Sequence, residues 1–136
     1  MSKSNINKIL KQLRAKERAI KRRSFQALND GADILKNEIV LSLQTVSPGK
    51  KYPRGKNKYH VASKAGDAPN IDHGGLVGSI QKKAISEDEV EVGSYNVSYA
   101  NDLEFGTSKI EARPFIKPAF DKHVEGIKKH IRKSFK

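Results

Sequence analysis

The histidine and carboxylate side chains are the residues of this chain best suited to metal or acid–base chemistry. His123 and His130 are seven residues apart in a predicted helix and so share a face, but no further ligand lies at a spacing that completes a metal site. The acidic run Glu87-Asp88-Glu89 lacks the ligand spacing of a calcium loop. We therefore expect no metal site in this protein.

Nucleophilic catalysis is not predicted either. Asp72 and His73 precede Ser79, but no strand–turn–helix elbow surrounds that serine. The chain contains no cysteine, which removes a thiol nucleophile, disulfides and thiolate metal sites from consideration. A glycine motif for binding phosphate is also missing. We expect no catalytic residue and no cofactor, and a protein that is not an enzyme.

The stretch from residue 99 to residue 121 combines many residues that shape a fold. It holds four of the nine aromatic residues, two of the five prolines and the turn glycine Gly106. Tyr99, Leu103 and Phe105 supply apolar surface before the turn. Such a density of signals predicts a compact corner where several elements meet.

The final helix begins within this corner. Pro114 or Pro118 marks its first turn, because the amides there have no partner inside the helix and proline is tolerated. The helix is expected to run from Phe115 or Lys117 to about Ser134, since its apolar residues recur every three or four positions.

The first third of the chain predicts one long helix, or two in sequence. From residue 25 onward, apolar residues again step by three or four, and the helix should end near Val46 because Ser47-Pro48-Gly49 is a stop signal. The buried stripe comprises Phe25, Leu28, Ala32, Leu35, Ile39, Leu43 and Val46. A long loop over residues 47–75 follows, in which Tyr52, Tyr59 and Val61 either pin the chain or form a short hairpin.

A small antiparallel sheet is expected between the loop and the corner. Leu76 and Ile80 predict one helical turn, and residues 81–86 a strand. Residues 90–93 alternate apolar and acidic residues and predict a second strand. Val97 and Tyr99 predict a third. The fold class is therefore α+β, with a long N-terminal helix and a C-terminal helix packed on a small antiparallel β-sheet and a long loop between the first helix and the sheet.

The net charge of +12 is distributed unevenly along the 136 residues. Residues 1–64 carry 16 basic and 4 acidic side chains, residues 65–108 carry 2 and 8, and residues 109–136 carry 9 and 3. We interpret residues 1–24 as a basic helical arm and residues 25–136 as a single α+β domain. The charged segments either form solvated faces or suit head-to-tail packing of identical subunits.

The basic arm leaves two interpretations open. It either contacts nucleic acid or an acidic partner, or it is a solvated arm that binds protein at most. No aromatic residues for stacking bases are interleaved with its basic residues. No stretch of the sequence is apolar for long enough to predict a transmembrane helix or a signal peptide, so we expect no contact with a membrane.

A series of short motifs resembles a known family. In order, they are Ser47-Pro48-Gly49, His60-Val61-Ala62-Ser63, Ala65-Gly66-Asp67-Ala68-Pro69, Asp72-His73-Gly74-Gly75-Leu76-Val77-Gly78-Ser79-Ile80, Val92-Gly93, Tyr99-Ala100, Glu104-Phe105-Gly106-Thr107, Ala112-Arg113-Pro114-Phe115 and Pro118-Ala119. Over about residues 25–130 the chain is similar to the small head–tail joining proteins of long-tailed bacteriophages and prophages, also described as tail-component or tail-completion proteins. The pair of Glu-Phe-Gly-Thr and Ala-Arg-Pro-Phe motifs is the most specific.

Three departures accompany this likeness. His73 stands where the family prefers threonine, an additional glycine leads into Leu76, and Val77 replaces a frequent arginine. These departures bear on the local turn. The basic arm, residues 1–24, lies outside the clear likeness.

The resemblance implies a structural virion protein without catalysis. Its expected role is that of a ring-forming subunit, with a hexamer expected, at the neck between the capsid connector and the tail. Its partners would be copies of itself, the neighbouring connector or head-completion proteins and tail proteins, with at most weak non-specific contact to the passing DNA. The protein would be found in the virion, and in the host cytoplasm during assembly. The alternative is a small basic nucleic-acid-binding module.

The residues expected to hold the corner or an interface are taken from residues 99–121. Glu104 and Arg113 flank the turn and are expected to form a charge-assisted bond within or between subunits, and Phe105 and Phe115 to anchor the corner in the core. The full set comprises Tyr99, Glu104, Phe105, Gly106, Arg113, Pro114, Phe115 and Pro118.

Overall fold

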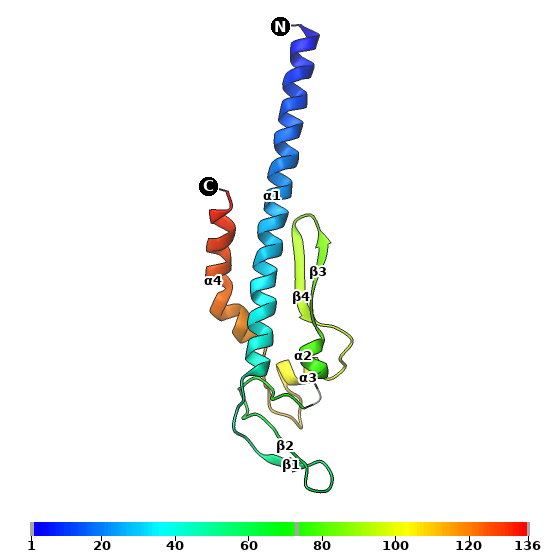
Figure 1. Cartoon of the computed structure of the whole chain (residues 1–136), viewed down its shortest axis with the longest axis vertical. Coiled ribbons are helices and arrows are strands. Elements are labelled where there is room, and N and C mark those ends of the chain that lie inside the picture. Colours follow the sequence, from blue (N-terminus) through cyan, green and yellow to red (C-terminus); the bar gives the residue numbers. More distant parts are fainter. Residues whose placement is uncertain (1, 73, 136) are drawn as a thin grey trace.

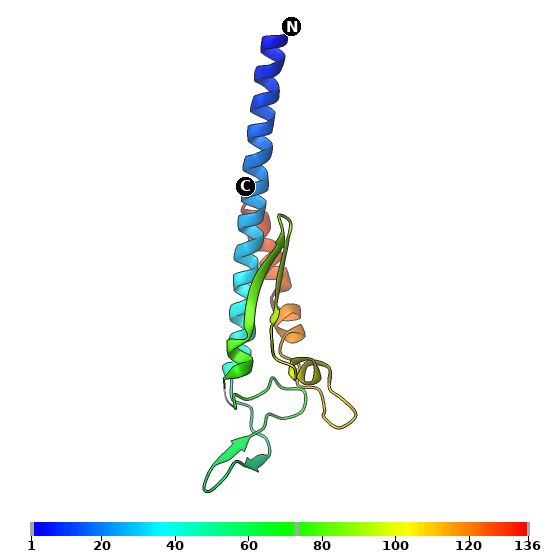
Figure 2. The ribbon, with the colours of Figure 1, turned by 90° about the vertical axis from the view of Figure 1, so that its right-hand side faces the viewer.

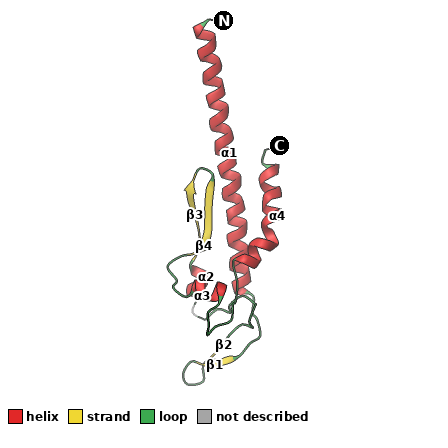
Figure 3. Ribbon diagram, turned by 180° about the vertical axis from the view of Figure 1, so that it is seen from behind, coloured by secondary structure: helices red, strands yellow, loops and turns green. Residues whose placement is uncertain are grey.

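The computed structural model describes residues 2–72 and 74–135, so Met1, His73 and Lys136 lie outside the described residues. The sequence-based arguments that involve His73 therefore also fall outside them. Within these residues the chain has an α+β fold, as predicted (Figure 3). Its elements, in order, are α1 (Lys3–Gln44), β1 (Lys51–Pro53), β2 (Tyr59–Val61), α2 (Gly75–Gly78), β3 (Ile80–Ser86), β4 (Glu89–Ser94), α3 (Ala100–Phe105) and α4 (Lys117–Lys133).

A single 42-residue helix, α1, forms the axis of the molecule. Ser2 caps it, since its Oγ accepts a hydrogen bond from the main-chain N–H of Asn5 at 3.3 Å. The helix continues through residues 24 and 25 without a break and ends two residues before the predicted Val46. Its second half packs against the rest of the chain, whereas its first half projects beyond every other element (Figures 1 and 2).

Strands β3 and β4 form an antiparallel hairpin that lies along α1. Ile80 pairs with Ser94 and Ala84 with Val90, and a bulge at Ile85 precedes the turn. The two strands agree with the sequence prediction, but the predicted third strand at Val97 and Tyr99 is wrong. Asn96, at a φ of 60°, turns the chain, and main-chain hydrogen bonds from Ala100 to Val97 and from Leu103 to Tyr99 then wind it into α3.

The long loop after α1 contains the short hairpin that the sequence left open. Tyr52 pairs with His60, and Lys51 with Val61, across β1 and β2. This hairpin lies at the end of the molecule opposite the N-terminus (Figure 1).

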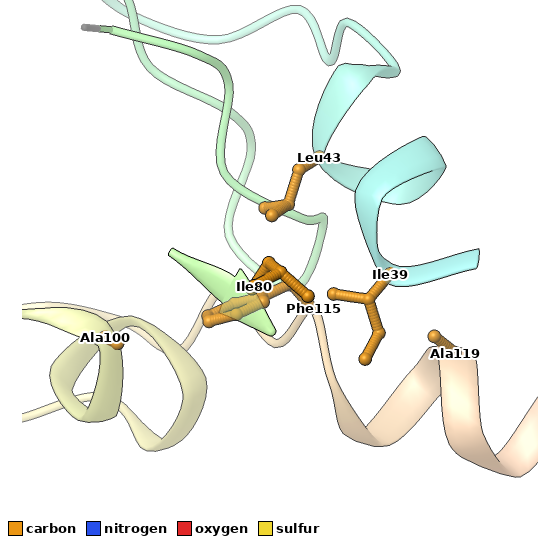
Figure 4. Packing of buried hydrophobic residues seen from close by; sticks show 6 residues of the cluster. All are labelled: Ile39, Leu43, Ile80, Ala100, Phe115 and Ala119. Atoms are coloured by element: carbon orange, nitrogen blue, oxygen red, sulfur yellow. The ribbon is translucent and has the colours of Figure 1, made fainter. Parts of the chain in front are cut away.

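The core lies where α1, the start of β3, α3 and the start of α4 meet. It consists of the buried side chains Ile39, Leu43, Ile80, Ala100, Phe115 and Ala119 (Figure 4). Only Phe115, Ile39 and Leu43 are large and fully buried among the described residues. Full burial of such a side chain contributes about 1.5–3 kcal/mol to the stability of the fold. The core is small, and many other large apolar side chains of the described residues remain exposed.

Helix α4 packs against the second half of α1 on a different flank from the β3–β4 hairpin (Figure 1). The contact is close at Gly31, where an added Cβ would lie 2.8 Å from Cγ2 of Ile127. His123 and His130 share the α4 face that meets α1, as their spacing predicted. Their Nε2 atoms lie 3.0 Å from a carboxylate oxygen of Glu38 and 3.8 Å from one of Asp30. No helix of the described residues is long and apolar enough to cross a membrane.

Candidate interaction site

The corner predicted over residues 99–121 is built around the carboxylate of Glu104. Its Oε2 accepts hydrogen bonds from the main-chain N–H groups of Phe115 and Ile116 at 2.8 and 3.0 Å, and its Oε1 accepts one from Lys117 at 2.8 Å. Lys117 is the first residue of α4, Ile116 is its N-cap and Phe115 directly precedes the cap, so these amides have no acceptor inside the helix. Helix α4 has no side-chain cap of its own. Glu104, at the end of α3, therefore caps it from another element.

The predicted bond between Glu104 and Arg113 is not formed within the chain. Both carboxylate oxygens of Glu104 bind main-chain amides. The Arg113 guanidinium turns toward the long loop, where Nε donates to the carbonyl oxygen of Ser63 at 3.2 Å. The main-chain N–H of Arg113 donates to the carbonyl of Leu103 at 2.6 Å. Arg113 thus joins the corner to the long loop, and contact between subunits stays a prediction.

Gly106 forms the turn as predicted. Its φ of 73° lies in the left-handed region, and an added Cβ would lie 2.9 Å from the main-chain nitrogen of Ala112 and 3.0 Å from the carbonyl oxygen of Ile110. Either observation would favour glycine, and both apply here. The turn brings residues 110–112 back beside the end of α3.

The two phenylalanines that flank the turn differ in burial. Phe115 is buried in the core, with 1% of its surface exposed, as predicted. The prediction that Phe105 also anchors the core is wrong, since 77% of its surface is exposed. Helix α3 buries Ala100 and half-buries Leu103, which are three residues apart, and Phe105 lies two positions beyond Leu103 on the other side of the helix.

The remaining predicted residues lie around this turn. Pro118 occupies the first turn of α4, and half-buried Pro114 precedes the helix. Tyr99 is about half exposed beside Leu76 and Val77 of α2. On the exposed side of α4, the Asp121 carboxylate accepts a hydrogen bond from Nζ of Lys117 at 2.8 Å and so raises the pKa of that lysine.

Sequence reasoning missed the polar network that fixes the long loop to the end of α1. The side chain of Asn70 makes three hydrogen bonds in this network. Its Oδ1 accepts from the N–H of Ser47 at 2.8 Å, while its Nδ2 donates to the carbonyls of Ser47 and Val61 at 2.7 and 2.8 Å. Ser47 also donates through Oγ to Asp67 at 2.7 Å. Ser47 and Asp67 belong to motifs quoted above. The signal available was Asn70 itself, a polar residue that directly follows Pro69 at the end of the motif over residues 65–69.

The side chains around the corner leave an uneven apolar surface. A groove lies between the β1–β2 hairpin and the loop after α3, lined by Tyr52, His60, Leu103, Ile110 and Arg113 among others. Phe105, Tyr59 and Val46 are exposed at this end of the molecule. In the described part of the chain, no three histidine, aspartate or glutamate side chains cluster as metal ligands would. The arrangement is suited to binding another protein surface.

Comparisons with known proteins give no relative for this chain. No protein-family model, no curated protein and no solved structure matches it.

Proposed function

We propose that this chain is a structural subunit of the neck of a tailed bacteriophage, where a ring of its copies joins the capsid connector to the tail. The observation that carries the proposal is the capping bond of Glu104. The Glu-Phe-Gly-Thr and Ala-Arg-Pro-Phe motifs, on which the resemblance to head–tail joining proteins chiefly rests, form one structural unit, because Glu104 of the first binds the main chain of Phe115 in the second.

Ring formation is supported by the balance between core and surface. Among the residues that the structure describes, three large side chains are fully buried, while exposed apolar side chains occur on α1, the β3–β4 hairpin, the corner and the β1–β2 hairpin. In an oligomer, contacts between subunits would cover part of this surface and supply stability that one chain lacks. We expect a hexamer, located in the virion after assembly in the host cytoplasm.

The corner would bind a different protein of the neck. Its groove and exposed aromatic residues would meet a neighbouring connector or tail protein. The test is light scattering over a concentration series, which gives the mass of the free protein. A discrete ring-sized species would support the proposal, and the mass of one chain at every concentration would count against a self-assembling ring.

A small basic nucleic-acid-binding module remains the second candidate, because the exposed first half of α1 carries most of the basic excess. Phosphate contacts would release counterions, so the affinity for a DNA duplex would fall steeply with added salt. Tight duplex binding by a protein that stays monomeric would favour this alternative.

A further inference from the structure

The first half of α1, residues 3–24, has no partner within the described chain. All but Ser24 of these residues are exposed, and Ser24 is half-buried. At about 1.5 Å per residue the segment extends about 33 Å, and it projects past the C-terminal end of α4 and the turn of the hairpin (Figures 1 and 2). We call this segment the arm.

The arm is amphipathic. At 3.6 residues per turn, its large apolar side chains fall within one arc of about 100°, and its nine basic side chains lie outside that arc. Leu13 is 56% exposed. Glu17 lies within the arc and pairs with Lys21 at 3.2 Å. The apolar residues, here called the arm stripe, are Ile6, Ile9, Leu10, Leu13 and Ile20.

The arm stripe continues a face of α1 that is covered farther along. Leu13, Ile20 and Ala27 are each seven residues apart and therefore lie on one line of the helix. Ala27 is buried at the end of the α1–α4 contact, where it lies near Ser134. Beyond that point the same line is exposed. A second surface is needed to cover it.

That surface must be apolar at its centre and acidic at its rim. A second arm does not meet this requirement, because each arm carries nine basic side chains and one acidic side chain and two arms would repel each other. Helix α4 does not meet it either, since its last turn is basic. The heptad positions that follow Ile9 are Lys16 and Arg23, which also disfavours a coiled coil of arms.

The turn of the β3–β4 hairpin has the required character. Residues 84–91, here called the hairpin tip, hold four acidic side chains and no basic one. Glu87, Asp88 and Glu89 are exposed, and the bulge leaves Ile85 53% exposed beside them. The hairpin is held to its own α1 lower down, by Lys82 and Asp33 at 2.6 Å. Its tip and the arm stripe are both exposed, so they do not cover each other within one copy.

We propose that the arm stripe of one copy binds the hairpin tip of a neighbouring copy. Ile85 of the neighbour would enter the stripe, and its acidic side chains would face the basic residues on either side. The two surfaces differ, so each copy can bind one neighbour through its arm and another through its tip. This is a heterologous contact, which closes into a ring when the rotation permits. The inference rests on the proposed ring and names its interface.

Two other occupants of the arm fit its chemistry less well. A DNA duplex would neutralise the basic residues but leave the apolar stripe uncovered. A membrane surface would cover the stripe, but the arm has no aromatic residue of the kind enriched at membrane interfaces, and Glu17 would enter the apolar layer. A protein surface with a central isoleucine and an acidic rim matches both the apolar stripe and the basic residues beside it, and Glu17 can keep its pairing with Lys21 at the edge of such a contact.

Charge reversal tests the contact directly. A tip variant carries Glu87→Lys, Asp88→Lys and Glu89→Lys, and an arm variant carries Arg14→Glu, Lys16→Glu and Arg23→Glu, whose side chains flank the stripe. Each variant alone places like charges together, and self-association should weaken by about a hundredfold or more. An equimolar mixture restores both kinds of contact in alternation, so light scattering should recover the wild-type mass.

The control for the tip variant carries Asp102→Lys, Glu111→Lys and Glu125→Lys, which raise the net charge by the same amount as the tip variant but away from the hairpin tip, and it should keep the wild-type mass. The inference is overturned, with the proposed ring intact, if the wild-type chain assembles and either reversed variant assembles equally well, or if the mixture stays dissociated. Loss of binding to a 20-base-pair duplex in the arm variant alone, with unchanged assembly, would likewise overturn it. A wild-type chain of single-chain mass throughout would overturn the ring together with the inference.

Discussion

The carboxylate of Glu104, near the C-terminal end of α3, accepts a 2.8 Å hydrogen bond from the main-chain N–H of Phe115, which lies eleven residues later and just before α4. Through the same carboxylate, α3 caps α4, and the turn at Gly106 closes between them. Phe115 then enters the core. The corner is therefore held by an interaction between a side chain and the backbone, where a pair of opposite charges had been expected.

Replacing Glu104 should destabilise the corner. Hydrogen bonds to a charged group contribute about 1.5–3 kcal/mol each, but they share one carboxylate and are not additive. We expect Glu104→Gln to lower the free energy of unfolding by about 2 kcal/mol and Glu104→Ala by about 3 kcal/mol, as measured by urea denaturation. Glu111→Gln, at an exposed site of the loop between α3 and α4, should have almost no effect on the free energy of unfolding. Equal stability of Glu104→Gln and the wild type would show that the charge contributes nothing, and equal stability of Glu104→Ala would show the same of the cap as a whole.

Two glycines on the paired helices should respond in opposite ways to alanine. At Gly31 an added Cβ would lie 2.8 Å from Cγ2 of Ile127, whereas nothing lies within 4 Å of one at Gly126. Alanine gains about 1 kcal/mol of helix propensity at either site, but overpacking costs about 1–3 kcal/mol. We expect Gly31→Ala to lower the melting temperature and Gly126→Ala to raise it. Ile127→Leu, which removes the branch at Cβ, should relieve part of the Gly31→Ala defect.

Loss of Asn70 should release the long loop while the helices remain. Asn70→Ala removes three hydrogen bonds between this side chain and the main chain of Ser47 and Val61, and it leaves the buried Ser47 amide without that acceptor. Amide hydrogen exchange should quicken over residues 47–72 and stay unchanged in α4. Asn101→Ala, at an exposed position of α3, is the matched control. Exchange that quickens equally throughout the chain would contradict a local role for this network.

The sequence was sufficient for elements whose pattern is local. The apolar steps of α1 and α4, the alternation of β4 and the stop at Ser47-Pro48-Gly49 each depend on neighbours within a few residues, and these elements are present. The partners of polar side chains were harder to predict. Glu104 binds main-chain amides and not Arg113, and Asn70 binds Ser47. These partners depend on how separate segments of the chain pack together, which the local pattern does not reveal.

The errors have the same origin. A run such as Val97-Ser98-Tyr99 fits a strand by alternation, but Asn96 at positive φ had already turned the chain away from β4. Phe105 looked like a core residue by type. Its side of α3 faces away from the core, and only the packing of Ala100 and Leu103 reveals that.

The exposed side chain of Phe105 leads to the last prediction, which separates assembly from folding. Phe105→Ser should change the free energy of unfolding by less than about 0.5 kcal/mol, because most of this side chain is already in water. Phe115→Ala, nine-tenths or more buried in the core, should cost about 3–5 kcal/mol. If the corner binds a neighbouring neck or tail protein, Phe105→Ser should leave the mass of the free oligomer unchanged and reduce joining of heads to tails in an in vitro complementation assay. A Phe105→Ser chain that unfolds more easily and joins particles normally would instead assign Phe105 to the fold.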